Sequence, residues 1–166
     1  MKCITLIGMP GSGKSTIGVL LAKMLGLDFV DTDILIQARE KALLQAVLDS
    51  RGPEAFLDLE ADVLCSLSCP EGAVIAPGGS CVSRERAMDH LKKLGPVVYI
   101  RLPYETIEGR ITNMETRGVA FRPGETLRDL YDYRAPLYEK YADITVETEG
   151  LALEQSAAAV LRALLP

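Results

Sequence analysis

The stretch IGMPGSGKST, from Ile7 to Thr16, decides the fold of this chain, because it places three glycines and a lysine directly after an apolar run. Gly8, Gly13, Lys14 and Ser15 match the pattern G-x-x-x-x-G-K-[ST] of a phosphate-binding loop. The β-branched run before the loop predicts a buried strand, and apolar residues after it recur at helical spacing. A strand, this loop and a helix in that order are the context that the pattern requires.

The chemistry of this loop indicates a nucleoside triphosphate as its ligand. Glycines let the backbone curl so that successive N–H groups face inward, and the following helix points its positive end at the same place. Lys14 would reach the β- and γ-phosphates, and Ser15 would ligate Mg²⁺. ATP is favoured because the sequence has no N-K-x-D-type segment that reads guanine; the alternative is a glycine-rich turn without a ligand. The predicted nucleotide-binding residues of the loop are Gly11, Ser12, Gly13, Lys14, Ser15 and Thr16.

Strand-like and helical segments alternate along the rest of the chain. The further strands are expected at Asp28–Asp33, Gly72–Gly79, Pro96–Leu102 and Asp143–Thr148. Between them we expect one helix from Ile34 to Gly52, another after Pro53, one capped by Ser83, and one that Pro136 kinks or breaks. This alternation predicts an α/β fold, with a five-stranded parallel sheet flanked by helices, in a single domain over residues 1–166. The stretch from Arg117 to Glu125 loses periodicity and is predicted to be a mobile loop.

Composition and charge narrow the classes of function. The 166 residues are 48% hydrophobic and 25% charged, with a net charge of −5 at pH 7. This acidic balance argues against a broad nucleic-acid surface, and no apolar run is long enough to cross a membrane. Four cysteines fit no zinc or C-x-x-C pattern. We therefore expect a cytoplasmic protein that acts on a small molecule, without nucleic-acid or membrane partners, and as a monomer.

Polar and glycine residues follow two of the predicted strands. Asp31 and Asp33 would point the same way if the second strand stays extended, toward the crevice where such sheets bind ligands. One carboxylate would then serve the Mg²⁺ ion and the other an attacking hydroxyl; the alternative is a solvated strand end that caps the next helix. Gly78 and Gly79 would let a substrate approach the backbone closely, or would form an ordinary turn.

Three arginines of the later half would complete such a site. A phosphoryl group in transfer needs cations at its oxygens. Arg110 and Arg117 flank the predicted mobile loop and would fold over ATP. Arg134 would pair with a substrate anion through its planar guanidinium. Each of the three is otherwise an ordinary surface charge.

These residues together resemble the shikimate kinase family over nearly the whole chain. GMPGSGKSTIG looks like the family's phosphate loop, DTD its paired aspartates, and YRAPLYEKYAD (Tyr133–Asp143) its R-x-P-L-Y segment. FLDLE (Phe56–Glu60) stands at the family's F-R-x-x-E motif, and PGGS at its triple glycine. The resemblance implies a P-loop fold like that of nucleoside monophosphate kinases, with a lid at about 112–125 and a substrate-binding helical region at about 34–62.

The family's activity, carried over residue by residue, implies transfer of the γ-phosphate of ATP to the 3-hydroxyl of shikimate. Lys14, Asp33 and Arg117 would be the catalytic residues, and Ser15 and Asp31 would serve Mg²⁺. Shikimate would be bound by Asp33, Gly78, Gly79 and Arg134, and ATP by the loop together with Arg110 and Arg117.

The substrate half departs from the family pattern. Leu57 stands where the family has a second arginine for the shikimate carboxylate, and Ser80 replaces the third glycine. Three hypotheses therefore stay open: a shikimate kinase, a kinase of another small hydroxy acid or polyol, and a nucleotide-binding protein without shikimate kinase activity. A nucleoside monophosphate kinase is disfavoured, because the chain is short and lacks an arginine-rich monophosphate site.

Overall fold

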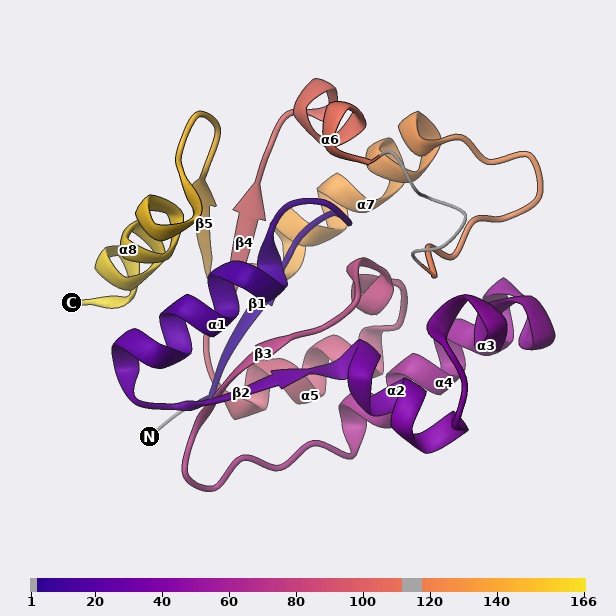
Figure 1. Cartoon of the computed structure of the whole chain (residues 1–166), viewed down its shortest axis with the longest axis horizontal. Coiled ribbons are helices and arrows are strands. Elements are labelled where there is room, and N and C mark those ends of the chain that lie inside the picture. Colours follow the sequence, from indigo (N-terminus) through magenta and orange to yellow (C-terminus); the bar gives the residue numbers. More distant parts are fainter. Residues whose placement is uncertain (1–2, 112–117) are drawn as a thin grey trace.

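A five-stranded parallel sheet forms the centre of the protein (Figure 1). The structure, a computed structural model, describes residues 3–111 and 118–166. The strand order is β2-β3-β1-β4-β5, so that β1, which leads into the phosphate loop, occupies the middle. The strands are β1 (Ile4–Ile7), β2 (Asp28–Asp31), β3 (Ala73–Ala76), β4 (Val97–Arg101) and β5 (Ile144–Glu147). The predicted fold class is confirmed.

The three inner strands are buried on both faces, as their continuous apolar sequences require. β2 and β5 form the edges and are partly exposed. In the pairing of β2 with β3, Asp31 lies opposite Ala76, so that the end of β2 lies beside Pro77 and Gly78. Parallel pairing thus brings segments that are far apart in the sequence to one edge of the sheet.

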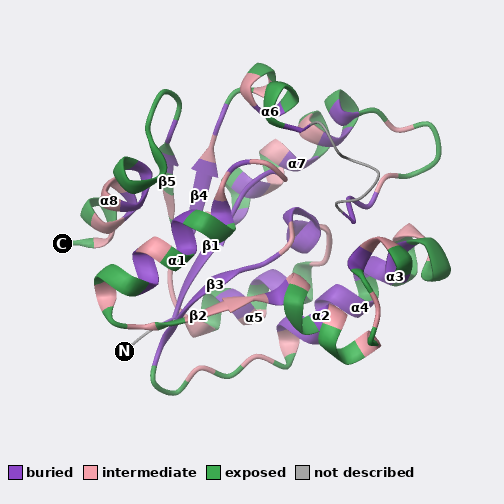
Figure 2. Ribbon diagram, viewed as in Figure 1, coloured by how far each residue is buried: buried purple, intermediate pink, exposed green. Residues whose placement is uncertain are grey.

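Helices cover both faces of the sheet (Figures 1 and 2). On one face, α1 (Lys14–Leu25) packs beside α8 (Leu153–Leu164) over an apolar cluster that includes Ile17, Leu21 and Val160. On the other face lie α5 (Glu85–Leu94) and α7 (Leu127–Tyr141), together with α4 (Pro53–Cys65). Their buried side chains include Met88, Leu130 and Tyr138. No helix in the described ranges combines the length and hydropathy needed to cross a bilayer.

A separate group of helices stands at the carboxyl side of β2. It consists of α2 (Thr32–Glu40), α3 (Leu44–Arg51) and α4 (Pro53–Cys65), packed around their own apolar cluster. The prediction of one continuous helix from Ile34 to Gly52 is wrong. The chain breaks at Lys41, which has a φ of 53° and ends α2 in the left-handed conformation. Helices occupy the predicted region 34–62, whereas its role in substrate binding stays a prediction.

Two further sequence expectations need correction. Ser83 does not cap a helix: it ends a short 3₁₀ helix, Gly79–Ser83, and Arg84 precedes α5. Pro136 does not break its helix, since α7 runs without interruption through it, and the alternative of a kink stays a prediction. After β4, α6 (Tyr104–Arg110) leads toward the predicted lid. Residues 112–117 of that lid lie outside the described residues, and its mobility stays a prediction.

Candidate active site

The loop between β1 and α1 has the conformation that an anion cradle requires. Gly8, Gly11 and Gly13 have φ values of 154°, 80° and 91°, which side-chain-bearing residues rarely adopt. Gly13 precedes α1 without a side-chain cap, so that no side chain occupies the N-terminal N–H groups of this 12-residue helix. A phosphate group would satisfy those donors and would benefit from the helix dipole. The loop therefore fits a nucleotide phosphate chain.

Lys14 is held inside the loop. Its Nζ donates a hydrogen bond to the Met9 carbonyl at 3.0 Å, and the residue is 8% exposed. Burial lowers the pKa of this ammonium to about 8, although nearby Cys81 and Asp33 act in the opposite direction. A buried ammonium gains much from a phosphate, because the anion replaces the water that the charge has lost.

The two aspartates do not share a face of an extended strand, and that expectation is wrong. β2 ends at Asp31, and Asp33 lies in the first turn of α2. The cause is capping: Asp31 Oδ1 accepts a hydrogen bond from the Asp33 backbone N–H at 2.9 Å. Asp31 Oδ2 accepts from the Ser15 hydroxyl at 3.1 Å. Asp31 therefore caps a helix, as the alternative interpretation expected, and also lies beside the phosphate loop, while its role toward Mg²⁺ stays a prediction.

Ser15 and Asp31 form a donor pair suited to Mg²⁺, an oxygen-preferring ion. Across the described part of the chain, no group of three or more Asp, Glu, His or Cys side chains is arranged to hold a metal ion. A magnesium ion here would therefore depend on phosphate oxygens and water for its remaining ligands, as is usual at nucleotide sites.

One cavity of about 410 Å³ joins the loop to the ends of the neighbouring strands. It brings together ten residues that the sequence predicts for the site: Gly11, Gly13, Lys14, Ser15, Thr16, Asp33, Gly78, Gly79, Arg110 and Arg134. Ser12 is buried behind the loop, with 1% exposure, and is not part of the lining. Asp31 reaches the site through Ser15. Arg117 lies outside the described residues, so its predicted role stays a prediction.

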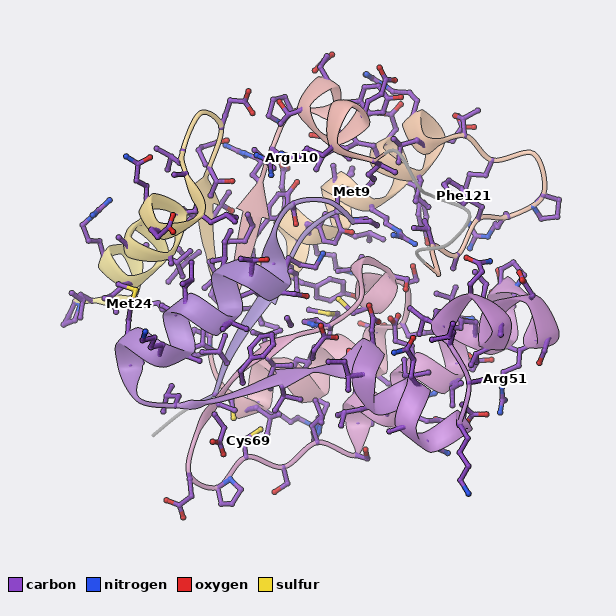
Figure 3. All side chains as sticks on the ribbon, viewed as in Figure 1. Met9, Met24, Arg51, Cys69, Arg110 and Phe121 are labelled. Atoms are coloured by element: carbon purple, nitrogen blue, oxygen red, sulfur yellow. The ribbon has the colours of Figure 1, made fainter. Side chains whose placement is uncertain are left out.

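Arg110 extends from the end of α6 toward the loop (Figure 3). Its guanidinium Nη1 donates to the Gly11 carbonyl at 3.3 Å, and the side chain lies on the exposed rim of the cavity. Arg110 therefore lies beside the phosphate loop, and its contact with a nucleotide stays a prediction.

Arg134 lies at the other end of the cavity, on α7. The residue is 2% exposed, and its Nε has no hydrogen-bond partner among the described residues. Gly79 permits this arrangement, since a Cβ there would lie 2.9 Å from Pro10 Cδ and 3.2 Å from Arg134 Nη1. Tyr138 donates to the Gly79 carbonyl at 2.6 Å and fixes the turn against α7. A buried guanidinium with a free donor is suited to an anionic substrate group.

Glu60 and Ser80 also belong to the cavity, and the sequence reasoning assigned neither of them a role in the site. Glu60, on α4, is 2% exposed, and its Oε1 accepts a hydrogen bond from the Ser80 hydroxyl at 2.7 Å. Burial raises the pKa of Glu60 to about 7, and the pKa of neighbouring Asp33 to about 6. In the part of the chain that the structure describes, neither Glu60 Oε2 nor Asp33 Oδ1 has a hydrogen-bond partner, and both are buried. The signal was present in FLDLE, where an acidic residue follows apolar ones at helical spacing.

Leu57, which stands one turn before Glu60, belongs to the apolar cluster of α2, α3 and α4. It is 5% exposed and does not line the main cavity. Instead it lines a small void of about 10 Å³ that Arg134 borders from another side. Leu57 therefore places a hydrocarbon surface, with no charge, beside the substrate end of the site.

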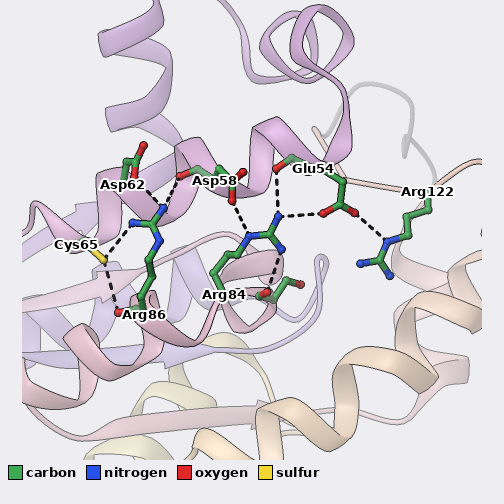
Figure 4. Close-up of polar contacts among 8 residues, drawn as sticks. Glu54, Asp58, Asp62, Cys65, Arg84, Arg86 and Arg122 are labelled. Carbon is green, nitrogen blue, oxygen red and sulfur yellow. Dashed lines mark hydrogen bonds and ion pairs between the residues drawn. The ribbon is translucent and has the colours of Figure 1, made fainter.

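Ion pairs lie on the opposite, exposed face of α4 (Figure 4). Arg84 pairs with Glu54 at 3.0 Å and with Asp58 at 2.8 Å, while Arg86 pairs with Asp62 at 2.8 Å. These partners recur at i, i+4 spacing, which leaves Glu60 on the face directed at the sheet.

A glycine-rich phosphate loop on a parallel sheet, open to a cavity with a carboxylate and a buried arginine, defines the class of P-loop small-molecule kinases. The chain belongs to the shikimate kinase family: the family model for shikimate kinase matches residues 10–165.

Individual relatives support the same family membership. The shikimate kinase of Thermodesulfovibrio yellowstonii is 35% identical over 164 residues, covering 98% of this chain and 94% of the relative. That of Pseudomonas paraeruginosa is 40% identical over 151 residues, covering 90% of this chain and 88% of the relative. The solved structure of shikimate kinase from Acinetobacter baumannii in complex with shikimate has a TM-score of 0.86 at 32% identity, covering 98% of this chain and 92% of the other.

Proposed function

We propose that this protein transfers the γ-phosphate of ATP to a hydroxyl of a small carboxylate-bearing metabolite, and that shikimate, through its 3-hydroxyl, is the leading acceptor. The observation that carries the proposal is one cavity that holds both the phosphate loop with Lys14 and the buried Arg134. Family membership supports ATP as donor, and the relatives named above support shikimate as acceptor.

The nucleotide half of the site would hold the triphosphate. The loop amides and Lys14 would bind phosphate oxygens, and Arg110 would cover them from the rim. Ser15 and Asp31 would hold Mg²⁺, which neutralises phosphate charge when it is bound. Arg117 would add a further cation over the nucleotide.

The acceptor half would hold and orient the alcohol. Arg134 would bind the acceptor carboxylate, and the open backbone at Gly78 and Gly79 would let the acceptor approach closely. Asp33 would accept a hydrogen bond from the attacking hydroxyl and point its oxygen at phosphorus. Burial that raises the pKa of Asp33 to about 6 makes this carboxylate a better proton acceptor than a solvated aspartate.

The direct test is ADP release with ATP, Mg²⁺ and shikimate, together with identification of shikimate 3-phosphate by mass spectrometry. ADP release that depends on shikimate supports the proposal. Nucleotide binding without ADP release for any of a panel of hydroxylated acids contradicts it, and would favour a nucleotide-binding protein without kinase activity.

A second candidate keeps the chemistry and changes the acceptor. The observation that favours it is Leu57, which supplies no charge where the family places a second arginine for the shikimate carboxylate. Weak turnover of shikimate with strong turnover of another hydroxy acid or polyol would select this candidate.

We also expect the protein to act as a monomer in the cytoplasm. Light scattering coupled to size-exclusion chromatography, and fractionation of the source cells, test these two expectations separately from the activity.

A further inference from the structure

The acceptor end of the cavity contains more acidic than basic side chains, and a substrate with only negative charge does not account for this excess. Its lining includes Asp33, Glu60 and Arg134 beside the loop lysine, Lys14. When Lys14 binds a triphosphate, the charged groups that remain at the acceptor end are the carboxylates of Asp33 and Glu60 and the guanidinium of Arg134. An acceptor whose only charge is a carboxylate would balance Arg134 and leave both acidic groups without a cation.

Glu60 in particular is buried and forms no ion pair with any described residue, although the charges of Arg134 and Lys14 act on it from a distance. Across residues 3–111 and 118–166 it has no ion-pair partner, and the Ser80 hydroxyl binds only its Oε1. A buried carboxylate oxygen without a partner is costly, and native structures keep few of them. Leu57, three residues earlier on the same helical face, offers no donor.

The free carboxylate oxygens meet at one place. A Cβ added to Gly78 would collide with Glu60 Oε2 and would lie 3.1 Å from Asp33 Oδ1. Both oxygens are buried without partners, and the glycine leaves the space beside them open. A donor group of a ligand at this place would satisfy both.

We infer that Glu60 is the binding group for an ammonium substituent, so that hydroxylated α-amino acids are acceptors of this kinase. This inference rests on the proposed phosphotransfer. Arg134 takes the carboxylate, Glu60 the ammonium and Asp33 the hydroxyl, which gives each substituent of such a molecule an oppositely charged or hydrogen-bonding partner. Where Asp33 and Glu60 are both ionised, a zwitterion also adds no net charge to a site with one excess negative charge.

The transfer is balanced in the same way as for any alcohol. The hydroxyl oxygen forms a bond to the γ-phosphorus, and the bond from that phosphorus to the bridging oxygen of ADP breaks. The hydroxyl proton passes through Asp33 to solvent. The products are an O-phosphorylated amino acid and ADP.

Matched pairs of acceptors isolate the ammonium group. L-homoserine is compared with 4-hydroxybutyrate, and L-serine with 3-hydroxypropionate, each with ATP and Mg²⁺, and shikimate is measured in parallel. A buried charge pair changes binding affinity by about tenfold at least and by several powers of ten at most. The kcat/KM of the better amino acid should therefore exceed that of its des-amino partner by about tenfold or more. Equal values within a pair overturn the inference.

A conservative variant then assigns the effect to one side chain. Glu60→Gln keeps the shape and the acceptor for Ser80 but removes the charge. It should raise KM for the amino acid by about tenfold or more, with kcat and the des-amino partner changed much less. Asp62→Asn, on the exposed face of the same helix, is the matched control and should change neither. An amino-acid preference that survives Glu60→Gln overturns the role of Glu60.

Binding provides a measurement that needs neither turnover nor a variant. Calorimetry with ADP and Mg²⁺ present should detect L-homoserine or L-serine more strongly than the des-amino partner. If shikimate is phosphorylated and neither amino acid binds, the inference fails while the proposed function stands. If no acceptor is phosphorylated, the proposed function fails, and calorimetry still decides whether the ammonium subsite exists.

Discussion

At the scale of single residues, Lys14 shows how much the nucleotide half depends on one charge. The free protein keeps an ammonium buried against the Met9 carbonyl, where desolvation lowers its pKa to about 8. Burying such an ammonium costs free energy unless a ligand compensates its charge. Its presence therefore indicates that the loop is suited to a bound anion.

Lys14→Ala should abolish transfer, with a fall in kcat/KM of about a thousandfold or more, because it removes the cation that acts on the transferring phosphate. Steady-state ADP release measures the effect. Lys23→Ala, in the exposed last turn of the same helix, is the control and should retain activity. A Lys14→Ala protein with the rate of the unaltered chain would refute the assignment of the loop.

Leu57 makes the substrate half testable in the same way. Leu57→Arg would place a guanidinium one turn before Glu60 and beside Arg134. A charge-assisted hydrogen bond contributes about 1.5–3 kcal/mol, so the affinity for shikimate should rise about ten- to hundredfold. Calorimetric titration with shikimate, with Leu57→Met as the control for lost packing, measures this change. Unchanged affinity in a folded variant would indicate an acceptor end built for a different molecule.

The sequence predicted the site unevenly, and the reason is physical. The phosphate loop is a local motif, so one stretch of ten residues defines most of the nucleotide half. Glu60 and Ser80 are 20 residues apart and meet only because α4 packs against the turn after β3. Whether a buried carboxylate has a partner depends on such contacts, which no spacing rule reveals.

At the scale of secondary-structure elements, strands were predicted better than the details of helices. Continuous β-branched runs specify buried strands directly, whereas helix ends depend on single capping contacts. Asp31 ends β2 and begins α2 by accepting a hydrogen bond from the Asp33 N–H, which the sequence offered only as an alternative to an extended strand. No glycine or proline at or beside Lys41 indicates this helix break in the sequence.

The position of Asp31, which caps α2 and contacts Ser15, gives a prediction about the magnesium requirement. Asp31→Asn keeps a capping side chain but loses the charge beside Ser15, so it should leave stability nearly unchanged and raise the Mg²⁺ concentration for half-maximal activity by about tenfold. Magnesium titrations of ADP release measure this. Thr126→Ala removes the capping box of α7 and serves as the control with the reverse pattern. It should lower the free energy of unfolding by about 1 kcal/mol and leave the magnesium requirement unchanged. An Asp31→Asn protein with normal magnesium dependence would exclude Asp31 from the metal site.

At the scale of the whole molecule, the fold stabilises a cluster of charges at the edge of its sheet. Three separate elements contribute one buried ionisable side chain each to the same cavity. Lys14 comes from the phosphate loop, Glu60 from α4 and Arg134 from α7. Packing of the three apolar clusters must therefore offset the cost of burying these groups. Stability of the free protein should accordingly depend on pH through the cluster.

Glu60 determines the sign of that dependence. Burial raises its pKa from 4.5 to about 7; Ser80, Arg134 and Lys14 act against this rise, and Asp33 adds to it. Between those two values the folded protein holds a proton that the unfolded chain has released, so the free energy of unfolding falls as pH rises. Below pH 4.5 both states are protonated and the contribution is constant, and above pH 7 the full penalty applies.

Urea unfolding of the ligand-free protein at pH 5.5 and pH 8, compared with Glu60→Gln, isolates this contribution. Asp143, whose pKa is lowered, is ionised in both the folded and the unfolded state across this interval and contributes nothing to the change. The free energy of unfolding of the unaltered chain should fall by about 2 kcal/mol more than that of the variant between the two pH values. Asp62→Asn, which removes a half-exposed carboxylate of the same helix, should follow the unaltered chain. Parallel curves for the unaltered chain and Glu60→Gln would mean that Glu60 finds a cation or water in solution, and the excess negative charge at the acceptor end would then not exist.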